Sequence, residues 1–458
     1  MDTPISSGEP GNDEARGADA ALERFRSLLR IPTVSQADEA DTDWAAFELF
    51  RSTVGQLYPR LSSELELELV AGHSMLYRWR GRSSGAPTVL MAHYDVVPAS
   101  DEGWVHPPFA ATLVGEGAER QLWGRGTLDD KGALVSVLEA VERLVVTGFT
   151  PQNDVYLSFG HNEETAGDGA AAVVAVLAGR GIRPSLVIDE GGAIAEGVFP
   201  GVTSPVAYVG VSEKGITNLR LSVEQAGGHA STPPRLTATA RLARAIVRLD
   251  SRPFPARMSP TTVEMISTLG AHVGGPLGAV FRGARRTRPL LLAVFTRLSD
   301  ETRALIRTTH AVTELSGSAA ANVLAERATA TVNMRVAVGS NVADAVRHVR
   351  RAIRDDVVRI DILEASEPSP VSPTTGPEWQ LVRELVESTY PGTIVAPYIQ
   401  LGASDSRRFT AISTNVYRFS PFRMSAEERA TLHAKNERIH VDTWLSGIDF
   451  YAELIARR

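Results

Sequence analysis

The first half of the chain alternates short apolar runs with stretches of helical periodicity, and this alternation limits the folds open to it. The runs at 88–92, 155–159 and 186–188 have the apolar, β-branched and aromatic character of buried strands. Between them, the stretches 131–146 and 169–177 have the pattern of helices. Strands that alternate with helices in this way predict an α/β fold with a largely parallel sheet.

The pattern changes after residue 210. The segments 216–224 and 328–338 alternate apolar and polar residues, as half-exposed strands do. A Pro-rich stretch, EPSPVSPTTGP at 367–377, indicates a linker back to the first domain. We therefore expect an α+β domain inserted into the α/β domain. The predicted segments are a disordered tail at 1–18, the α/β domain at 19–211 and 367–458, and the inserted domain at 212–366.

Composition excludes several classes of protein. A chain of 458 residues is too long for one compact core, which agrees with two domains. Its net charge of −7 offers no basic field for nucleic acid. Because it has no cysteine, any metal must be bound by His, Asp or Glu. The N-terminus lacks the pattern of a signal peptide and the apolar runs are short, so we expect a cytoplasmic protein with no membrane partner.

Acidic and imidazole side chains follow each predicted strand of the first domain. They are His93 and Asp95, Glu163 and Glu164, and Asp189 and Glu190, with Asp129 and Asp130 in a Gly-flanked turn before a helix. Ligands of open α/β sheets bind beyond the carboxyl ends of the strands, so these side chains are expected at one edge. Bunched carboxylates resist burial unless a cation neutralises them. Imidazole together with carboxylate favours a divalent metal, Zn²⁺ above all.

Taken singly, each of these residues has an ordinary structural explanation. Asp130 stands where a side chain would cap the helix that begins at Lys131. Asp95 could be one of the many aspartates that stabilise turns. Four such clusters, three after strands and one in the turn before a helix, favour the metal site over these separate explanations.

Several motifs resemble one known family in their order and spacing. MAHYDVVP, GRGTLDDKG, HNEET and IDEGG are similar to motifs of the dinuclear zinc aminoacylase/carboxypeptidase family. VSEKGITNLRL, GHASTPP and HAKNERI resemble its carboxypeptidase S and N-acyl-amino-acid hydrolase branch. The resemblance implies a zinc-hydrolase catalytic domain on the mostly parallel sheet. It also implies that the inserted domain is a ferredoxin-like lid that makes a homodimer.

The resemblance assigns five metal ligands for two zinc ions, with Co²⁺ or Mn²⁺ as other possible metals. His93 and Glu190 would bind one ion, Glu164 and His433 the other, and Asp129 would bridge the two.

Two of these assignments have neighbours that compete with them. Asp189 competes with Glu190, which the match to the DEG motif favours, and His440 competes with His433, which precedes NERI in the manner of the family.

The resemblance also assigns the residues that would carry the chemistry. Asp95 would orient the imidazole of His93, and Glu163 would be the general base. Adjacent residues on a strand point to opposite faces. The pair at 163 and 164 would therefore supply a proton acceptor on the substrate side and a ligand on the metal side.

Four further residues are candidates for substrate binding and catalysis outside the metal cluster. His229, in GGHASTPP, resembles a histidine that reaches across the dimer to stabilise the oxyanion. Asn322 and Arg335 resemble groups that bind the scissile carbonyl and the substrate carboxylate. Arg407 is a weaker candidate for a carboxylate clamp, since an Arg fork matches a carboxylate.

A basic and apolar stretch from 252 to 310 has no counterpart in the small members of the family. It would either pack as helices on the lid surface or lengthen the lid to hold an apolar acyl group, and the first interpretation is favoured.

The predicted function is metal-dependent hydrolysis of an amide bond, of the carboxypeptidase or aminoacylase type. The substrate would be a peptide C-terminus or an N-acyl amino acid. A dipeptidase is the alternative within the family, and a binding protein without activity is the alternative outside it. The intact set of ligands and the base at 163 argue against the binding protein.

Overall fold

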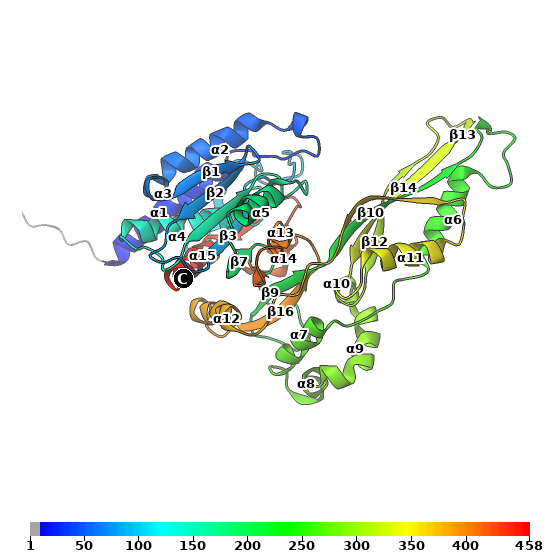
Figure 1. Cartoon of the computed structure of the whole chain (residues 1–458). Helices are drawn as coiled ribbons and strands as arrows, with labels where there is room; N and C mark the ends of the chain where they lie inside the picture. The colour runs from blue at the N-terminus through cyan, green and yellow to red at the C-terminus, as the bar shows by residue number, and fades with distance from the viewer. Residues whose placement is uncertain (1–9) are drawn as a thin grey trace, which may run out of the picture. The chain divides into compact units, whose positions relative to one another are not determined.

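The computed structural model describes residues 10–458, which divide into two compact units (Figure 1). The first contains the chain up to Val209 together with Ser372–Val395 and Ser404–Arg458. The second contains Gly210–Val371 and Ala396–Ala403. The predicted segments differ here, because they left 396–403 in the first domain. In the structure Lys214 N donates to Gln400 O at 3.2 Å and ties this short segment to the second unit.

The first unit is built on the mostly parallel sheet that the sequence predicts. Strands β6, β3, β7 and β17 are adjacent and parallel, β2 pairs antiparallel with β6, and β1 pairs antiparallel with β2. The full order is β1-β2-β6-β3-β7-β17-β9-β8-β18, with β16 paired to β9. The strands are β1 Glu66–Val70, β2 Ser74–Trp79, β3 Thr88–His93, β6 Val155–Gly160, β7 Leu186–Asp189, β8 Ile194–Ala195, β9 Val206–Glu213, β16 Ile394–Gln400, β17 Val416–Arg418 and β18 Arg423–Met424.

Helices pack against this sheet through apolar side chains. Helix α4 packs on β3 and on α15, and α5 packs on β2 and β6. Strands β4 Thr112–Val114, β5 Gln121–Trp123 and β19 Arg438–His440 form a small separate sheet. The helices are α1 Pro10–Leu29, α2 Trp44–Leu57, α3 Pro59–Glu64, α4 Lys131–Val146, α5 Gly169–Gly179, α12 Pro377–Thr389, α13 Ser406–Phe409, α14 Ala426–Arg429 and α15 Val441–Ala456, with 3-10 turns at Glu39–Asp41 and Gly117–Glu119.

The predicted N-terminal tail is wrong over its second half. Helix α1 begins at Pro10, well before the predicted boundary at residue 18. The stretch after Pro10 is rich in Ala, Glu and Arg, which favour helix, and Pro is suited to the first helical position. Residues 1–9 lie outside the described part of the chain.

The second unit has the ferredoxin-like order of elements. Its antiparallel sheet has the order β12-β14-β10-β15, and α6 and α11 lie together on one side of it (Figure 1). Along the chain the order is β-α-β-β-α-β, which makes the unit a split βαβ fold. The elements are β10 Gly215–Glu224, α6 Ala238–Asp250, β12 Thr309–Ser316, β14 Arg327–Val336, α11 Val342–Ile353 and β15 Arg359–Ser366, with a ribbon of β11 Gly228–His229 and β13 Val323–Leu324.

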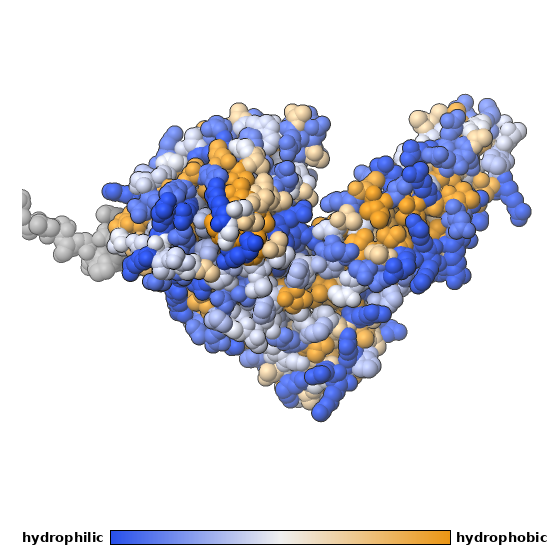
Figure 2. Space-filling view, in the orientation of Figure 1, coloured by the Kyte–Doolittle hydropathy of each residue, from blue (hydrophilic) through white to orange (hydrophobic). Residues whose placement is uncertain are grey.

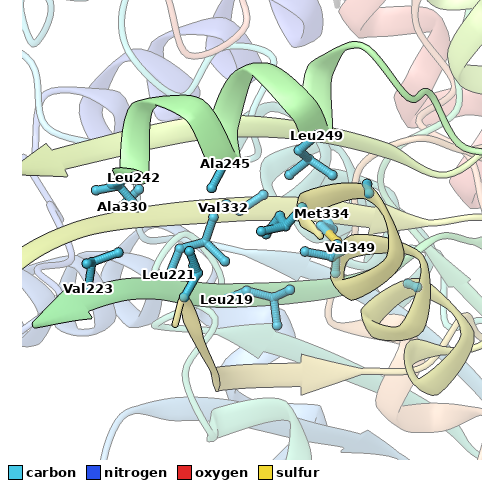
Figure 3. Close-up of a cluster of buried hydrophobic side chains, with 14 of the residues drawn as sticks. Leu219, Leu221, Val223, Leu242, Ala245, Leu249, Ala330, Val332, Met334 and Val349 are labelled. Carbon is cyan, nitrogen blue, oxygen red and sulfur yellow. The ribbon is translucent and has the colours of Figure 1, made fainter. Parts of the chain in front are cut away.

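One apolar cluster holds the two helices to this sheet (Figure 3). Alternate residues of β10 and β14 point toward the helices, which is why the sequence shows a period of two there. The labelled members are Leu219, Leu221, Val223, Ala330, Val332 and Met334 from the strands and Leu242, Ala245, Leu249 and Val349 from the helices.

The stretch from 252 to 310 folds into four helices, α7 Pro260–Gly270, α8 Gly275–Arg282, α9 Ala284–Leu298 and α10 Asp300–Leu305. Their inward side chains, among them Ile266, Phe281 and Phe295, are buried, so this stretch packs as helices. Both hydrophobic and hydrophilic residues are exposed on the surface of these helices (Figure 2). Among residues 10–458, none of the helices is both long and apolar enough to cross a membrane.

We predict that Leu221→Ala destabilises the second unit by about 2–5 kcal/mol, because it leaves a cavity in a fully buried site. The measurement is urea denaturation followed by far-UV circular dichroism and by tryptophan fluorescence. All 6 tryptophans lie in the first unit, so the dichroism transition should shift more than the fluorescence transition. The control is Leu315→Ala, since Leu315 is 68% exposed on β12 and should change stability by less than about 0.5 kcal/mol. Equal effects of the two substitutions would contradict the packing described here.

Candidate metal centre

Three of the five candidate ligands come from the carboxyl ends of three adjacent parallel strands. His93 is the last residue of β3, and its register partner on β6 is Gly160, the last residue of that strand. Glu163 and Glu164 follow β6 by a few residues, and Glu190 directly follows β7. Because β6, β3 and β7 are neighbours and run parallel, their ends meet at one edge of the sheet.

The side chains form two groups with the spacing of metal sites. His93, Asp129 and Glu190 make one group, in which the potential ligand atoms lie within 4.8 Å of one another. Asp129, Glu164 and His433 make the other, on the same criterion. Asp129 belongs to both. The five ligands that the sequence predicted are therefore brought together, in the predicted division into two sites.

The two oxygens of Asp129 face two different imidazoles. Oδ1 lies 3.0 Å from Nε2 of His93, and Oδ2 lies 2.9 Å from Nε2 of His433. His433 Nε2 also lies 3.1 Å from Glu164 Oε2. This is the arrangement required of a carboxylate that bridges two cations.

His433 occupies an unusual backbone conformation, with φ of 56°. The left-handed region costs a non-glycine residue on the order of 1 kcal/mol, and such residues cluster at functional sites. The conformation belongs to a loop that presents the imidazole to Asp129 and Glu164.

The carboxylates of the cluster fit a divalent cation. Burial raises the pKa of Glu190 well above its usual value, and the charges of Asp129 and Glu163 raise it further. Burial raises the pKa of Glu164 as well, and its Oε1 is a buried atom without a hydrogen-bond partner in the described chain. Anionic oxygens that lack partners and repel one another are stabilised by a metal ion, and the nitrogen and oxygen donors suit zinc-like metals.

The two imidazoles, His93 and His433, have raised pKa values, so bound protons supply part of the positive charge that a metal ion would bring. Hydrogen bonds to Asp129 and Glu164 raise the pKa of His433 to about 10. Burial lowers the pKa of His93, but its hydrogen bonds to Asp129 and Asp95 outweigh burial and leave it well above the usual value. An imidazole must be neutral to bind a metal, so metal binding here would release protons.

Asp95 is fully buried and orients both the imidazole and the two glutamates. His93 Nδ1 lies 3.0 Å from the backbone oxygen of Asp95 and 3.4 Å from its Oδ1, so the backbone makes the closer contact. The carboxylate accepts hydrogen bonds from the backbone N–H of Glu163 at 3.2 Å and of Glu164 at 3.1 Å. It therefore fixes the loop that carries the candidate base.

Asp189 and His440, which compete with Glu190 and His433 as ligands, have other partners in the structure. Asp189 lies outside both groups, and its Oδ2 accepts a hydrogen bond from Ser406 N at 2.9 Å. His440 also lies outside them, with Nε2 2.9 Å from Gln121 Nε2. The geometry therefore places Glu190 and His433, and neither competitor, in the cluster.

The expected helix cap by Asp130 is wrong. The residue stands at the N-cap position of α4, but its side chain makes no capping hydrogen bond. Oδ2 instead accepts from His93 N at 3.3 Å, and Oδ1 is buried without a partner in the described chain. The side chain has turned away from the helix toward the end of β3, where it adds to the acidic cluster.

Glu437 is a buried carboxylate that the sequence analysis missed. Its oxygens accept hydrogen bonds from three backbone N–H groups of the loop that carries Asp129: Gly126 at 3.1 Å, Leu128 at 2.8 Å and Asp129 at 3.2 Å. Arg125 donates to Glu437 Oε2 at 2.7 Å and to the backbone oxygen of Ala434 at 2.9 Å. Glu437 thus fixes the position of Asp129 relative to the loop of His433.

A signal for this residue was present in the sequence. The Gly-flanked turn before Asp129 exposes several N–H groups that need an acceptor, and NERI supplies a carboxylate close to His433.

The other candidates lie away from this cluster in the chain. His229 lies in β11, which pairs with β13, and is therefore in a short strand and not in a free loop. Its Nδ1 lies 2.8 Å from Ser231 Oγ, and Ala230 N donates to Asn322 O at 3.0 Å. His229 and Asn322 are therefore neighbours within the second unit.

Arg335 and Arg407 lie in different units. Arg335 is on β14, opposite Ile216 of β10, whereas Arg407 is in α13 of the first unit. Burial and the charge of Arg335 together lower the pKa of Lys214 to about 7, so these two cations are neighbours in the second unit.

A mostly parallel sheet with an imidazole–carboxylate cluster at its carboxyl edge defines a class of protein, the α/β metal-dependent hydrolases. Residues 89–457 match the family described as Peptidase family M20/M25/M40. The chain belongs to this family and is a metal-dependent hydrolase of amide bonds, as the motifs implied.

Named relatives and solved structures agree with this membership. The chain is 35% identical over 445 residues to the human N-fatty-acyl-amino acid synthase/hydrolase PM20D1, covering 95% of this chain and 87% of the relative. It is 30% identical over 495 residues to carboxypeptidase S of Saccharomyces cerevisiae, covering 95% and 84%.

The solved structures establish the fold. The M20 family metallo-carboxypeptidase Sso-CP2 of Sulfolobus solfataricus has a TM-score of 0.68 at 16% identity, covering 95% of this chain and 98% of that one. Human carnosine dipeptidase 1 has a TM-score of 0.64 at 14% identity, covering 97% and 98%.

We predict that Glu437→Gln weakens metal binding about 10- to 100-fold, the range typical of residues that orient metal ligands. The amide keeps the size of the side chain but cannot accept all the hydrogen bonds from the Asp129 loop. The measurement is zinc affinity by competition with a chelator. The control is Glu427→Gln, whose side chain is 83% exposed and should leave the affinity unchanged. Unaltered zinc affinity in Glu437→Gln would show that this clamp does not position Asp129.

Proposed function

We propose that the chain is a dinuclear zinc amidohydrolase that releases an amino acid with a free carboxylate from an N-acyl amino acid or from a peptide C-terminus. The observation that carries the proposal is the position of Asp129 between two groups of potential ligands, with Glu163 next to one of those ligands in the chain. The names of the relatives, an N-fatty-acyl-amino acid synthase/hydrolase and a carboxypeptidase, support this substrate class.

His93 and Glu190 would hold one zinc ion, Glu164 and His433 the other, and Asp129 both. The bound ions would supply Lewis acidity, which polarises the scissile carbonyl and makes water a stronger nucleophile near neutral pH. Co²⁺ or Mn²⁺ would fit the same donors. Asp95 and Glu437 would keep His93 and Asp129 oriented toward the ions.

Glu163 is proposed to move the proton. Burial raises the pKa of Glu163 well above the usual range, and the charges of Asp405, Asp129 and Glu164 act in the same direction, against His93. A carboxylate of raised pKa accepts a proton from the attacking water and then donates it to the leaving nitrogen. Its backbone N–H is held by Asp95, which fixes where the transfer takes place.

The second unit is proposed to act as a lid that recognises the substrate. Arg335 would bind the substrate carboxylate with its guanidinium fork, and Asn322 would bind the scissile carbonyl. His229 would donate a hydrogen bond to the oxyanion of the transition state. We propose that it does so in the site of a partner subunit, in a homodimer formed through this unit. Arg407 remains a second candidate for the carboxylate.

A hydrolysis screen tests the proposed substrate class. The panel would hold dipeptides, longer peptides, and acyl amino acids with short and long chains, with metal analysis of the same protein. Turnover of acyl amino acids or of peptide C-termini supports the proposal, while turnover of dipeptides alone would make the chain a dipeptidase. A metal-loaded protein inert to the whole panel would favour the binding protein.

We predict opposite effects of two neighbouring substitutions. Glu163→Gln removes the base and should lower kcat by at least about 10²-fold while both metals stay bound. Glu164→Gln removes a ligand and should lower metal occupancy. The measurements are kcat with a substrate from the screen and the metal content after dialysis. Loss of metal in Glu163→Gln with full occupancy in Glu164→Gln would reverse the two roles.

We predict that His229→Ala lowers kcat by about 10²–10³-fold, because a donor to the oxyanion acts mainly in the transition state. Metal content should stay unchanged. If the donor crosses between subunits, mixing Glu163→Gln with His229→Ala should restore part of the activity, since one hybrid site keeps both groups. The control is Ser231→Ala, which removes the hydroxyl 2.8 Å from Nδ1 of His229 and keeps the imidazole.

Two results would count against this role. Unchanged turnover in His229→Ala would remove the residue from the mechanism. Verified subunit exchange without any recovery of activity would leave His229 acting within its own subunit.

A further inference from the structure

A cavity of about 380 Å³ lies entirely within the second unit. It is formed by four segments: the loop after α6, the loop between α10 and β12, the turn between β14 and α11, and the first turns of α11. A volume of this size matches the sites of small metabolites. None of the proposed metal ligands or substrate-binding residues lines it.

The lining is strongly basic. Arg257, Arg307, Arg347 and Arg351 all contribute, and Asp344 is the one acidic residue in the lining. Asp344 forms an ion pair with Arg347. Arg257, Arg307 and Arg351 have no carboxylate partner among the described residues. Three guanidinium groups around one cavity therefore lack a counter-charge within residues 10–458.

Arg307 is the most informative of the three, because it is only 8% exposed. Its Nε is buried and makes no hydrogen bond in the described chain, and one terminal nitrogen donates to Thr296 Oγ1 at 3.0 Å. Its backbone oxygen accepts from Lys214 Nζ at 2.8 Å. Arg307 is thus a buried cation that Thr296 and Lys214 hold in position, and its Nε–H has no acceptor within the described part of the chain. Such a guanidinium is preorganised to bind an anion.

The rest of the lining is apolar or fixed in position. Phe254 and Ile306 are buried and contribute carbon surface. The ring of His348 stacks on Phe254 at 4.1 Å, and its Nε2 lies 2.8 Å from the backbone oxygen of Arg252. The cavity thus pairs an arginine cluster with an apolar wall, which suits a small molecule with one highly charged end.

We propose that this cavity binds a small polyanion of the phosphate class, such as a diphosphate or a molecule with two phosphate groups. Three guanidinium groups without a counter-charge carry more positive charge than one carboxylate would neutralise. Each guanidinium can also bind two oxygens of a phosphate at once. The site belongs to the second unit alone and does not depend on the proposed metal centre.

The test is titration calorimetry of the metal-loaded protein with inorganic pyrophosphate and, separately, with citrate at the same ionic strength. The double substitution Arg257→Ala and Arg351→Ala removes two exposed side chains from the lining and should weaken pyrophosphate binding at least about tenfold. Arg350→Ala is the matched control, because Arg350 is an exposed neighbour on α11 outside the lining. It should leave the affinity unchanged. Neither the double variant nor the control should change the affinity for pyrophosphate that is bound at the metal ions. A loss confined to the double variant therefore reports binding in the cavity.

Three outcomes would overturn the proposal. Equal pyrophosphate affinity in wild type and double variant would show that the cavity does not bind it. An equal loss in the Arg350→Ala control would show a general effect of surface charge. Tighter binding of citrate than of pyrophosphate would replace phosphate with polycarboxylate as the ligand class.

Discussion

Mutual repulsion among carboxylates is the constraint on which the first unit depends. Asp129, Glu163, Glu164 and Glu190 collect at the carboxyl edge of the sheet, and burial and neighbouring charge raise the pKa values of the three glutamates. No apolar packing would favour such a set, so the surrounding structure has to hold it in place. Positive charge at His93 and His433 offsets part of the repulsion, and a pair of divalent cations would offset more.

Two buried carboxylates outside the ligand set fix the loops that carry the ligands. Asp95 accepts hydrogen bonds from backbone N–H groups of the loop after β6, and Glu437 accepts them from the loop before α4. Each therefore converts a flexible connection into a defined one at the point where it carries a ligand. Arg125 then joins the Glu437 clamp to the loop of His433 through Ala434.

The sequence predicted the parts that follow from periodicity and from strand ends. Alternating strands and helices located the parallel sheet, and the acids after the strands located the ligand cluster, because the edge of a parallel sheet brings them together. The direction in which a side chain turns is not encoded locally, which is why Asp130 was expected to cap a helix that it does not cap. Glu437 was missed because its partners lie more than 300 residues earlier in the chain. The basic cavity was missed for the same reason, since Arg257 and Arg351 meet only after folding.

The second unit is not one continuous piece of chain, since 396–403 returns to it after the chain has left at Val371. Strands β9 and β16 each run from one unit into the other. Exchange of the second unit between members of the family would therefore need two grafts, one at 210–371 and one at the end of β16. A deletion that removed only the longer segment would leave 396–403 without the backbone partner that Lys214 provides. Recombination that preserves function is thus restricted to crossovers that carry both segments together.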